Sequence, residues 1–347
     1  MRSLSKLSVQ LNVEDFLPAS DAERESLTVM RKSVGFWKDG IRRLKKNKIS
    51  MTSLVVILLV FILSFIVPQL YPYSYEQQIR GSENLAPMQY SQKEITAMDS
   101  GESVFPHILG TDNLGRDYAI RVMMGSRVSL TVGLVASAII LLIGSLYGSI
   151  AGFFGGWVDM IMMRIVDMIY TVPDILIIVL LSVAFDQPLK ALAQRPGFQW
   201  IQLIGVNLIS IFVVFALLYW VGMARIVRSQ ILILKEQEYV TAARALGASS
   251  GHIIKKHLLT NCIGTLIVTT TLQIPSSIFT ESFLSFLGLG VAAPMPSLGS
   301  LASAALNGLQ SYPHRLFAPA LMISVIILSF NLLGDGLRDA FDPKLKD

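Results

Sequence analysis

Acidic and histidine side chains that could perform acid–base chemistry are few and poorly placed in this chain of 347 residues. Asp167 and Asp174 are the one nearby acidic pair in an apolar stretch, and seven residues along a helix separate them by about 10 Å. That distance is too long for two carboxyl groups to act together on one bond. The histidines form no H-E-x-x-H pattern and are scattered between apolar runs, at His107, His252, His257 and His314. We therefore predict no catalytic residues and no enzymatic activity.

Nucleotide and metal chemistry also lack their usual motifs. The sequence contains no G-x-x-x-x-G-K-[ST] pattern and no Gly-Lys dipeptide, so we expect no phosphate-binding loop. The single cysteine, Cys262, has no disulfide partner and no metal-ligand spacing. We predict no metal site and no cofactor in this chain; if ATP drives it, another polypeptide binds the ATP and Mg²⁺.

The segment EYVTAARALGASSGHIIKKHLLTN, from Glu238 to Asn261, is a basic amphipathic stretch between two apolar runs. Its small residues would let another protein approach the backbone closely, and Gly247 permits a sharp turn after a first short helix. Apolar and charged side chains around this turn could anchor and orient a partner: Tyr239, Leu246, Ile253, Ile254, Arg244, Lys255 and Lys256. The segment is interpreted as a docking site for a soluble protein; the alternative is a loop helix packed on its own membrane domain.

Apolar runs must position this segment, because 52% of the residues are hydrophobic and only 15% are charged. Five uncharged windows are long enough to cross a bilayer, which takes roughly 20 helical residues: Ile49 to Tyr75, Val128 to Val158, Gly197 to Ala224, Leu258 to Thr280 and Leu316 to Gly334. A sixth span, about Ile161 to Phe185, is interrupted by three charged residues. We therefore predict six membrane-spanning helices, with both ends of the chain on one side.

Basic residues near span ends indicate which side that is, because short loops rich in Lys and Arg stay in the cytoplasm. They concentrate before the first span and after the fourth: Lys38, Arg42, Arg43, Lys45, Lys46, Lys48, Arg225, Arg228, Lys235, Arg244, Lys255 and Lys256. The expected organisation is a cytoplasmic tail and interfacial amphipathic helix at 1–50, a first span at 51–70 and an extracytoplasmic loop at 71–127. A five-helix core at 128–336, with a cytoplasmic loop at 225–262, and a cytoplasmic tail at 337–347 follow. Lipid and topology explain the positive charge, so we expect no nucleic-acid binding.

Four segments together resemble one family. The Glu238 loop resembles the permease pattern E-A-A, three residues, G, nine residues, I-x-L-P, although Thr241, His257 and Thr260 depart from it. The others are ILGTDNLGRDYAIRVMMGSRVSL, ESFLSFLGLGVAAPMPSLG (with Leu298 where Trp is usual) and NLLGDGLRDAFDPKLK, in the family's order. On these motifs the chain is similar to C-type permease subunits of dipeptide, oligopeptide and nickel ABC importers. The implied fold is all-α: six transmembrane helices of the type I ABC-importer permease fold.

The resemblance also implies partners and sites. The partners are a second, B-type permease, two ABC ATPase subunits, an extracytoplasmic peptide-binding protein, the peptide substrate and membrane lipid. The residues expected to couple to the ATPase are Glu238, Tyr239, Thr241, Ala242, Ala243, Arg244, Gly247, Ala248 and His257. Those expected to meet the binding protein, or only to seal the outer mouth, are Thr111, Asp112, Arg116 and Asp117. The expected location is the bacterial cell membrane.

Within the membrane, the predictions concern packing and charge. Glycines every four residues from Gly144 to Gly152 favour close helix contact. Arg164 and Asp167 could neutralise each other one turn apart. Asp174 lacks such a partner and, with Glu281, could border the translocation path; alternatively it pairs with a basic residue of a neighbouring subunit.

The predicted function is thus that of a permease forming half of a path for oligopeptides and coupled to an ATPase. A nickel or dipeptide importer permease of the same family remains open. So does a secondary transporter, although the two halves show no similarity.

Overall fold

The computed structural model describes residues 35–291 and 293–341. In these ranges the chain forms helices and no β-strand; an isolated bridge joins Thr111 and Asp117. Six helical stretches of the described residues are long and apolar enough to cross a membrane, judged by length and composition: Lys48–Leu70, Tyr118–Phe154, Ile175–Ala193, Val206–Leu234, Ile263–Phe286 and His314–Phe341. The predicted all-α class with six candidate spans is confirmed.

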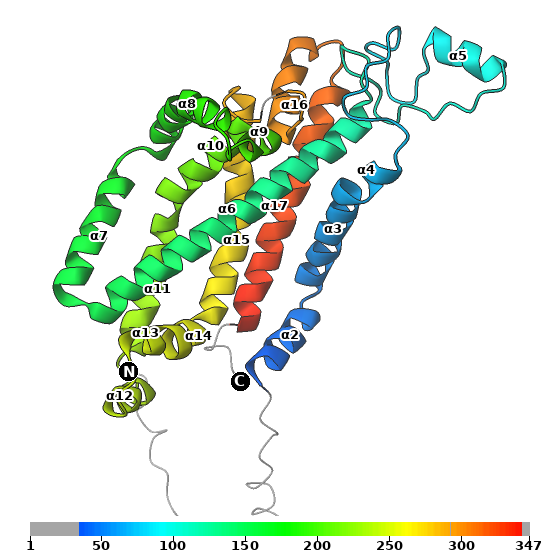
Figure 1. Ribbon diagram of the computed structural model, residues 1–347. Helices are drawn as coiled ribbons and strands as arrows, with labels where there is room; N and C mark the ends of the chain where they lie inside the picture. Colours follow the sequence, from blue (N-terminus) through cyan, green and yellow to red (C-terminus); the bar gives the residue numbers. More distant parts are fainter. Residues whose placement is uncertain (1–34, 292, 342–347) are drawn as a thin grey trace, which may run out of the picture.

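Figure 1 shows the order of the elements along the chain. The first half comprises α2 (Phe36–Lys46), α3 (Lys48–Phe65), α4 (Val67–Leu70), α5 (Gln92–Asp99), α6 (Tyr118–Phe154), α7 (Gly156–Thr171) and α8 (Asp174–Ala193). Next come α9 (Trp200–Ile204), α10 (Val206–Val214), the π-helical turn η2 (Phe215–Tyr219), α11 (Trp220–Leu234), α12 (Glu238–Ala245), α13 (Ser250–His252) and the π-helical turn η3 (Ile253–Leu258). The remainder is α14 (Leu259–Asn261), α15 (Ile263–Phe286), α16 (Leu298–Ala305), the 3₁₀ turn η4 (Leu306–Gly308) and α17 (His314–Phe341).

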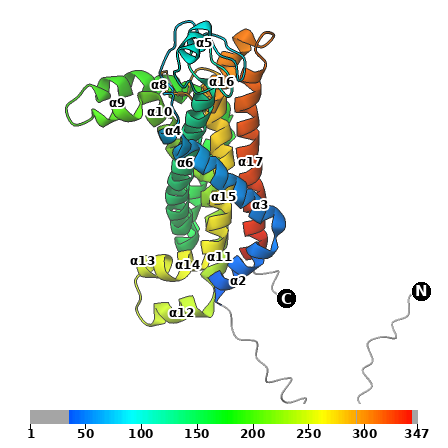
Figure 2. The same cartoon turned by 90° about the vertical axis from the view of Figure 1, so that its right-hand side faces the viewer.

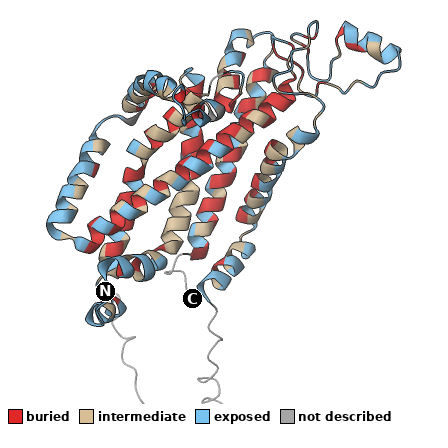
Figure 3. Cartoon of the chain, in the orientation of Figure 1, coloured by how far each residue is buried: buried red, intermediate tan, exposed pale blue. Residues whose placement is uncertain are grey.

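Helix α6 is the centre of the bundle and packs along α11, α15 and α3, while α17 packs on α15 and α3. Buried residues follow α6 and the faces turned toward it, whereas α7 is mostly exposed (Figure 3). The glycine row of α6 meets α11: a Cβ at Gly144 would lie 2.6 Å from the Cβ of Met223, and one at Gly152 would lie 2.9 Å from that of Ile231. The prediction that this row packs helices is confirmed, because any side chain there would push α11 away.

Helix α6 begins earlier than the sequence suggested. The sequence predicts a separate surface helix there, because Leu114, Tyr118 and Val122 recur every four residues after the candidate N-caps Thr111, Asp112 and Asn113. Instead Tyr118 starts the spanning helix itself, and its cap is Asp117, which accepts a hydrogen bond from the backbone N–H of Ile120 at 3.0 Å. The apolar spacing predicted the helix correctly, but nothing in it indicated that the helix runs on into the span.

The third span is not the single helix expected from Ile161 to Phe185. The chain bends at Val172, whose backbone is extended (φ −87°, ψ 135°), and Pro173 precedes the first residue of α8. Proline disfavours the helical conformation in the residue before it, which explains the break. Helix α7 runs along the bundle (Figure 1), whereas α8, α9 and α10 extend sideways from the end that carries α5 (Figure 2).

The two ends of the chain can be compared with the predicted boundaries only in part. The expected N-terminal amphipathic helix is present as α2, and residues 1–34 of the predicted tail lie outside the described residues. Helix α17 continues to Phe341, beyond the predicted span end at 336, and residues 342–347 are not described. Below, "the α5 end" means the end carrying residues 71–117, and "the α12 end" means the opposite one.

Candidate functional site

The loop from α12 to α14 projects at the α12 end (Figure 1). Helix α12 ends at Ala245, and Gly247 takes a left-handed φ of +80° while the backbone N–H of Ala248 bonds to the carbonyl of Ala243 at 3.0 Å. A Cβ at Gly247 would meet no atom within 4 Å. Glycine is therefore required there by its backbone conformation and not by lack of space.

Three contacts tie this α12–α14 loop together. The side-chain amide of Asn261 donates to the hydroxyl of Tyr239 at 3.2 Å and to the carbonyl of His257 at 2.6 Å. Val240 is fully buried in the main apolar cluster. The loop is thus a closed unit attached to the bundle rather than a loose connection.

Most of the predicted coupling residues lie on the surface of the loop. Glu238, Tyr239, Thr241, Ala242, Arg244 and Gly247 are exposed, and Ala243, Ala248 and His257 are partly buried. Leu246 is 88% exposed, the most exposed large apolar side chain in the described residues. Ile253 was wrongly predicted as part of an external anchor, because it is 1% exposed and packs in the chain's own core.

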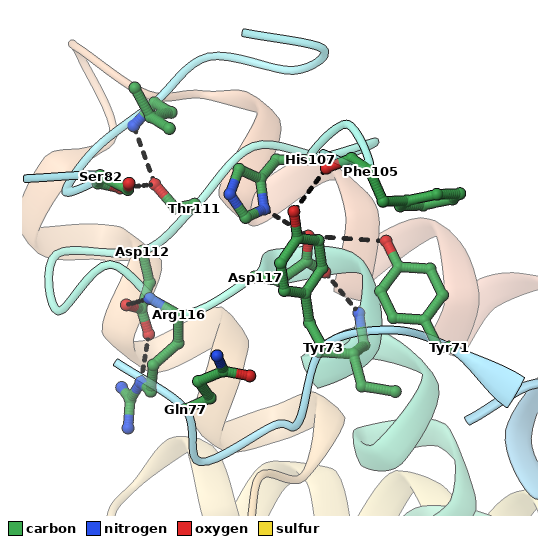
Figure 4. A network of polar contacts seen from close by, with 12 residues as sticks. Tyr71, Tyr73, Gln77, Ser82, Phe105, His107, Thr111, Asp112, Arg116 and Asp117 are labelled. Atoms are coloured by element: carbon green, nitrogen blue, oxygen red, sulfur yellow. Dashed lines mark hydrogen bonds and ion pairs between the residues drawn. The ribbon is translucent and has the colours of Figure 1, made fainter. Parts of the chain in front are cut away.

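At the α5 end, residues 71–117 enclose a buried ionic network centred on His107 (Figure 4). The Nδ1 atom of His107 lies 2.8 Å from Oδ2 of Asp117, and its Nε2 atom lies 3.0 Å from Oε1 of Glu94. Tyr73 stacks on the imidazole at 4.6 Å between ring centroids. Since both ring nitrogens face carboxylate oxygens, both donate hydrogen bonds and the ring is an imidazolium ion.

Burial and hydrogen bonding shift the pKa values of His107 and Glu94 in opposite directions. Burial lowers the pKa of His107, but the hydrogen bonds to Asp117 and Glu94 outweigh it and raise that pKa above its usual value. Burial likewise raises the pKa of Glu94, while the N–H of Ser91 and the imidazole of His107 together bring it below its usual value. The folded loop therefore favours the charged form of both groups more than water does.

A second group of hydrogen bonds and ion pairs lies beside the His107 network and contains the residues predicted to meet a binding protein. Asp112 accepts hydrogen bonds from the Arg116 side chain at 2.7 Å and from the backbone N–H of Leu114 at 2.8 Å. The spacing of four residues between Asp112 and Arg116 predicts such a pair, and the structure confirms it. Thr111 donates to the carbonyl of Ser82 and accepts from the N–H of Leu85.

Burial corrects the role assigned to these residues. Thr111, Asp112 and Asp117 are buried, and the Arg116 side chain is 14% exposed. They shape the loop from within and offer little surface to another protein. Sequence reasoning missed His107 and Glu94, because no spacing rule brings together residues 94, 107 and 117 of an irregular loop.

The two predicted path residues are placed differently. Glu281 in α15 is fully buried and accepts hydrogen bonds at 2.7 Å from the hydroxyls of Ser129 and Ser285. Glu281 was expected to border the translocation path. In the structure it instead links α15 to α6 through these hydrogen bonds. Asp174 begins α8, but its side chain lies outside the described parts of the chain.

Ion pairs attach α7 to α11 across the bundle. Oδ1 of Asp167 lies 2.7 Å from a guanidinium nitrogen of Arg225, and Asp159 forms a bidentate pair with Arg228 at 2.5 Å. The expected pairing of Arg164 with Asp167 is wrong. The one-turn spacing was suitable, but the α7 carboxylates face basic residues of α11 instead.

A cavity of about 410 Å³, called the bent-helix cavity below, lies beside the break between α7 and α8. One wall is the α7–α8 bend and the other is η2 with the start of α11. The lining residues are Ile169, Tyr170, Thr171, Val172, Pro173, Ile177, Leu218, Tyr219, Val221 and Gly222. Non-helical backbone within a membrane domain is tolerated where protein covers it or where it lines a water-filled cavity.

In the described residues no group of three or more His, Cys, Asp or Glu side chains could hold a metal ion. The described residues instead form a loop with a buried ionic network at the α5 end, a projecting loop at the α12 end, and a helical bundle with the bent-helix cavity between the two loops.

Comparison with known proteins agrees with this arrangement. Residues 144–347 match the family described as the binding-protein-dependent transport system inner membrane component, and residues 35–87 match the N-terminal TM domain of oligopeptide transport permease C. The oligopeptide transport system permease protein OppC of Bacillus subtilis is 39% identical over 95% of this chain and 97% of its own length. The dipeptide transport system permease protein DppC of the same organism is 42% identical over 97% and 95%. The glutathione transport system permease protein GsiD of Pectobacterium atrosepticum is 33% identical over 89% and 92%.

Fold and matches together define a multi-pass membrane permease, the transport component of a binding-protein-dependent importer. The chain belongs to the family of C-type permeases of peptide ABC importers, as its sequence motifs predicted.

Proposed function

We propose that this chain forms one half of the translocation path of an oligopeptide importer and is moved by ATPase subunits that grip the α12–α14 loop. The carrying observation is Leu246, a large aliphatic side chain 88% exposed at the turn of a loop that is otherwise tied to the bundle. Arg244 and Lys255 of the same loop are exposed as well, and an exposed apolar side chain accompanied by exposed cations suits an anchor that a partner's pocket covers.

The orientation of the chain in the membrane is inferred from charge. Lys and Arg concentrate at the α12 end, which supports a cytoplasmic position for that end and for both termini. The α5 end then faces the outside of a bacterial cell and meets the binding protein. ATP and Mg²⁺ belong to the two ATPase subunits, and a B-type permease completes the path.

The bent-helix cavity is the part of this chain that best suits a path. Its walls mix apolar side chains with the Tyr170 and Tyr219 rings and the non-helical backbone at Val172 and Pro173. A moving peptide needs contacts of this mixed kind, which hold no one side chain tightly. Asp174 follows this bend directly, so it stays a candidate for the path.

Oligopeptide and dipeptide cargo are both supported by the names of the relatives. The two are separated by uptake measurements in which a labelled pentapeptide competes with excess unlabelled dipeptide. Pentapeptide uptake that persists under excess dipeptide supports the oligopeptide assignment, and its suppression supports a dipeptide importer.

The test of coupling is Leu246→Asp, with Leu246→Met as the matched control. Because Leu246 is almost fully exposed, the Asp variant should insert normally but lose peptide uptake at least tenfold, together with the peptide-stimulated ATPase activity of the complex. Met keeps the apolar anchor and should keep both activities. An Asp variant with undiminished uptake and stimulation would refute the proposed coupling site.

A further inference from the structure

A surface groove of about 450 Å³ runs between α3 and α17 near the α12 end. It is lined by Lys48, Ile49, Thr52, Ser53, Val56, Val325, Leu328, Ser329 and Leu332. Ser53 and Ser329 are buried, and their small side chains leave the depression between the helices, whereas Ile49 and Leu328 are exposed. Between Lys48 and Val56 the groove covers about 12 Å of helix, at about 1.5 Å per residue.

The mouth of this groove is cationic. Lys48 lines it, and Lys45 and Lys46 form the last turn of α2 immediately before it. All three are exposed, and within residues 35–291 and 293–341 none of them forms an ion pair with a carboxylate. The apolar groove therefore ends beside lysines that have no carboxylate of the described residues within ion-pair distance, at the point where the spanning helix begins.

Helix α2 is fixed in place, so these lysines are not on a loose tail. The rings of Phe36 and Trp37 contact that of Phe341, at 5.3 and 5.8 Å between centroids. Gly40 brings the α2 backbone against the same ring, where a Cβ would lie 2.4 Å from a ring carbon of Phe341. Aromatic contacts thus hold the amphipathic helix on the end of α17, beside α3 (Figures 1 and 2).

We propose that this groove binds one phospholipid with an anionic headgroup. An acyl chain lies along Thr52, Val56 and Leu328, and the headgroup phosphate lies among Lys45, Lys46 and Lys48. A neutral lipid would fill the apolar part equally well but would leave the lysines without a counter-charge. A helix of another subunit would bring apolar side chains to the groove and would not neutralise its mouth. Charge complementarity therefore favours the anionic lipid.

The assembled importer, purified in nanodiscs of equal parts phosphatidylglycerol and phosphatidylcholine, provides the test. Lipids that stay bound are counted by native mass spectrometry. Each basic residue near an anionic headgroup contributes about 1 kcal/mol, which corresponds to about fivefold enrichment per lysine. Wild-type complex should retain phosphatidylglycerol over phosphatidylcholine by at least that factor.

Separate variants test the lysines at the mouth of the groove and the apolar groove itself. Lys45→Gln with Lys48→Gln should reduce the enrichment at least fivefold, while Lys255→Gln with Lys256→Gln, the same loss of charge at the same end of the bundle, should leave it unchanged. Thr52→Trp, at an exposed position on the rim, should reduce the number of retained lipids by one per chain.

Equal retention of the two lipids by the wild type, or an equal loss of enrichment in both lysine variants, would overturn the proposal. An unchanged lipid count in Thr52→Trp together with a lower yield of assembled complex would overturn it in another way, because a protein helix would then occupy the groove.

Discussion

The two loops at opposite ends of the bundle use polar residues in opposite ways. The α5-end loop turns His107, Glu94, Asp112 and Asp117 inward. His107 pairs with Glu94 and Asp117, and Asp112 pairs with Arg116. The α12–α14 loop buries Val240 and leaves Leu246 and most of its charges in solvent. Both resembled docking surfaces in sequence. The motif residues of the α5-end loop are mostly buried within it, so the apolar side chains that it leaves exposed are others, such as Met88, Ile95 and Met98. Polar residues in a motif therefore indicate a binding surface only when their partners are not in the same chain.

The largest effect on the contrast between the two loops is expected from the substitution Asp117→Ala. Asp117 caps α6 and neutralises His107, so Asp117→Ala leaves a buried imidazolium without its nearer counter-ion and a helix without its cap. We expect a loss of unfolding free energy of about 3 kcal/mol or more. Chemical denaturation of the purified complex, followed at the α5 end, measures it.

Glu102→Ala is the matched control, because Glu102 is an exposed carboxylate of the same loop. It should leave the denaturation midpoint unchanged. An Asp117→Ala protein as stable as this control would mean that the buried ionic network is not a structural unit.

The network also predicts a dependence on pH that the other loop should lack. The pKa of His107 is raised in the folded state, so its stabilising effect is complete below the unfolded value of about 6.5 and is lost as pH rises through the higher folded value. The pKa of Glu94 is lowered, so its effect is present above about 4.3 and is lost as pH falls through its folded value.

Stability of the α5-end loop should therefore be greatest between about pH 4.3 and 6.5, where both contributions are complete, and decline toward alkaline pH. Hydrogen exchange of residues 91–120 at a series of pH values, corrected for intrinsic exchange, measures this. His107→Gln should remove the alkaline decline; if the decline persists in that variant, another group is responsible for it.

At the α12 end the corresponding test concerns backbone conformation. Gly247→Ala places a Cβ at φ +80°, which costs about 1 kcal/mol even though no neighbouring atom obstructs it. The turn should loosen, and peptide-stimulated ATPase activity should fall several-fold while the stability of the whole complex barely changes.

Gly251→Ala in the same loop is the control. Gly251 has no positive φ and open space around it within α13, so alanine there should be neutral or stabilising by about 0.5 kcal/mol. Equal loss of activity in both variants would indicate that the loop tolerates no added side chain at either position. The left-handed backbone conformation of Gly247 would then not be the reason for the loss.

The features visible in sequence were those encoded over one or two helical turns. The apolar spans, the glycine row of α6, the turn at Gly247 and the Asp112–Arg116 pair all follow from local spacing. Pro173 was visible too, but an apolar run on both sides of it was taken as one helix. An apolar pattern reports contact with lipid or protein and says little about direction, so the sideways course of α8 was not predicted.

Contacts between distant segments were not predictable from spacing. Asp167 had a suitable cation one turn away, yet it pairs with Arg225, 58 residues later, because α7 and α11 lie side by side. Glu281 seemed a free carboxylate because its serine partners come from α6 as well as from its own helix. In both cases the sequence identified a charge that needs a partner, and tertiary packing selected it.

The smallest expected effect concerns Arg244, whose guanidinium lies 5.1 Å from the centre of the Phe153 ring. At an exposed site such a contact is worth about 0.5–1 kcal/mol, so Arg244→Ala should barely change the unfolding free energy of the complex. If Arg244 instead orients the ATPase, the same substitution should weaken ATPase binding several-fold and make it less sensitive to salt, because a steering charge is lost. Arg116→Ala, which removes a cation from the opposite loop, should show the reverse: lower stability and unchanged ATPase affinity. Titrating purified ATPase onto the two variants at low and high salt distinguishes a loop built for a partner from one built around its own ion pairs.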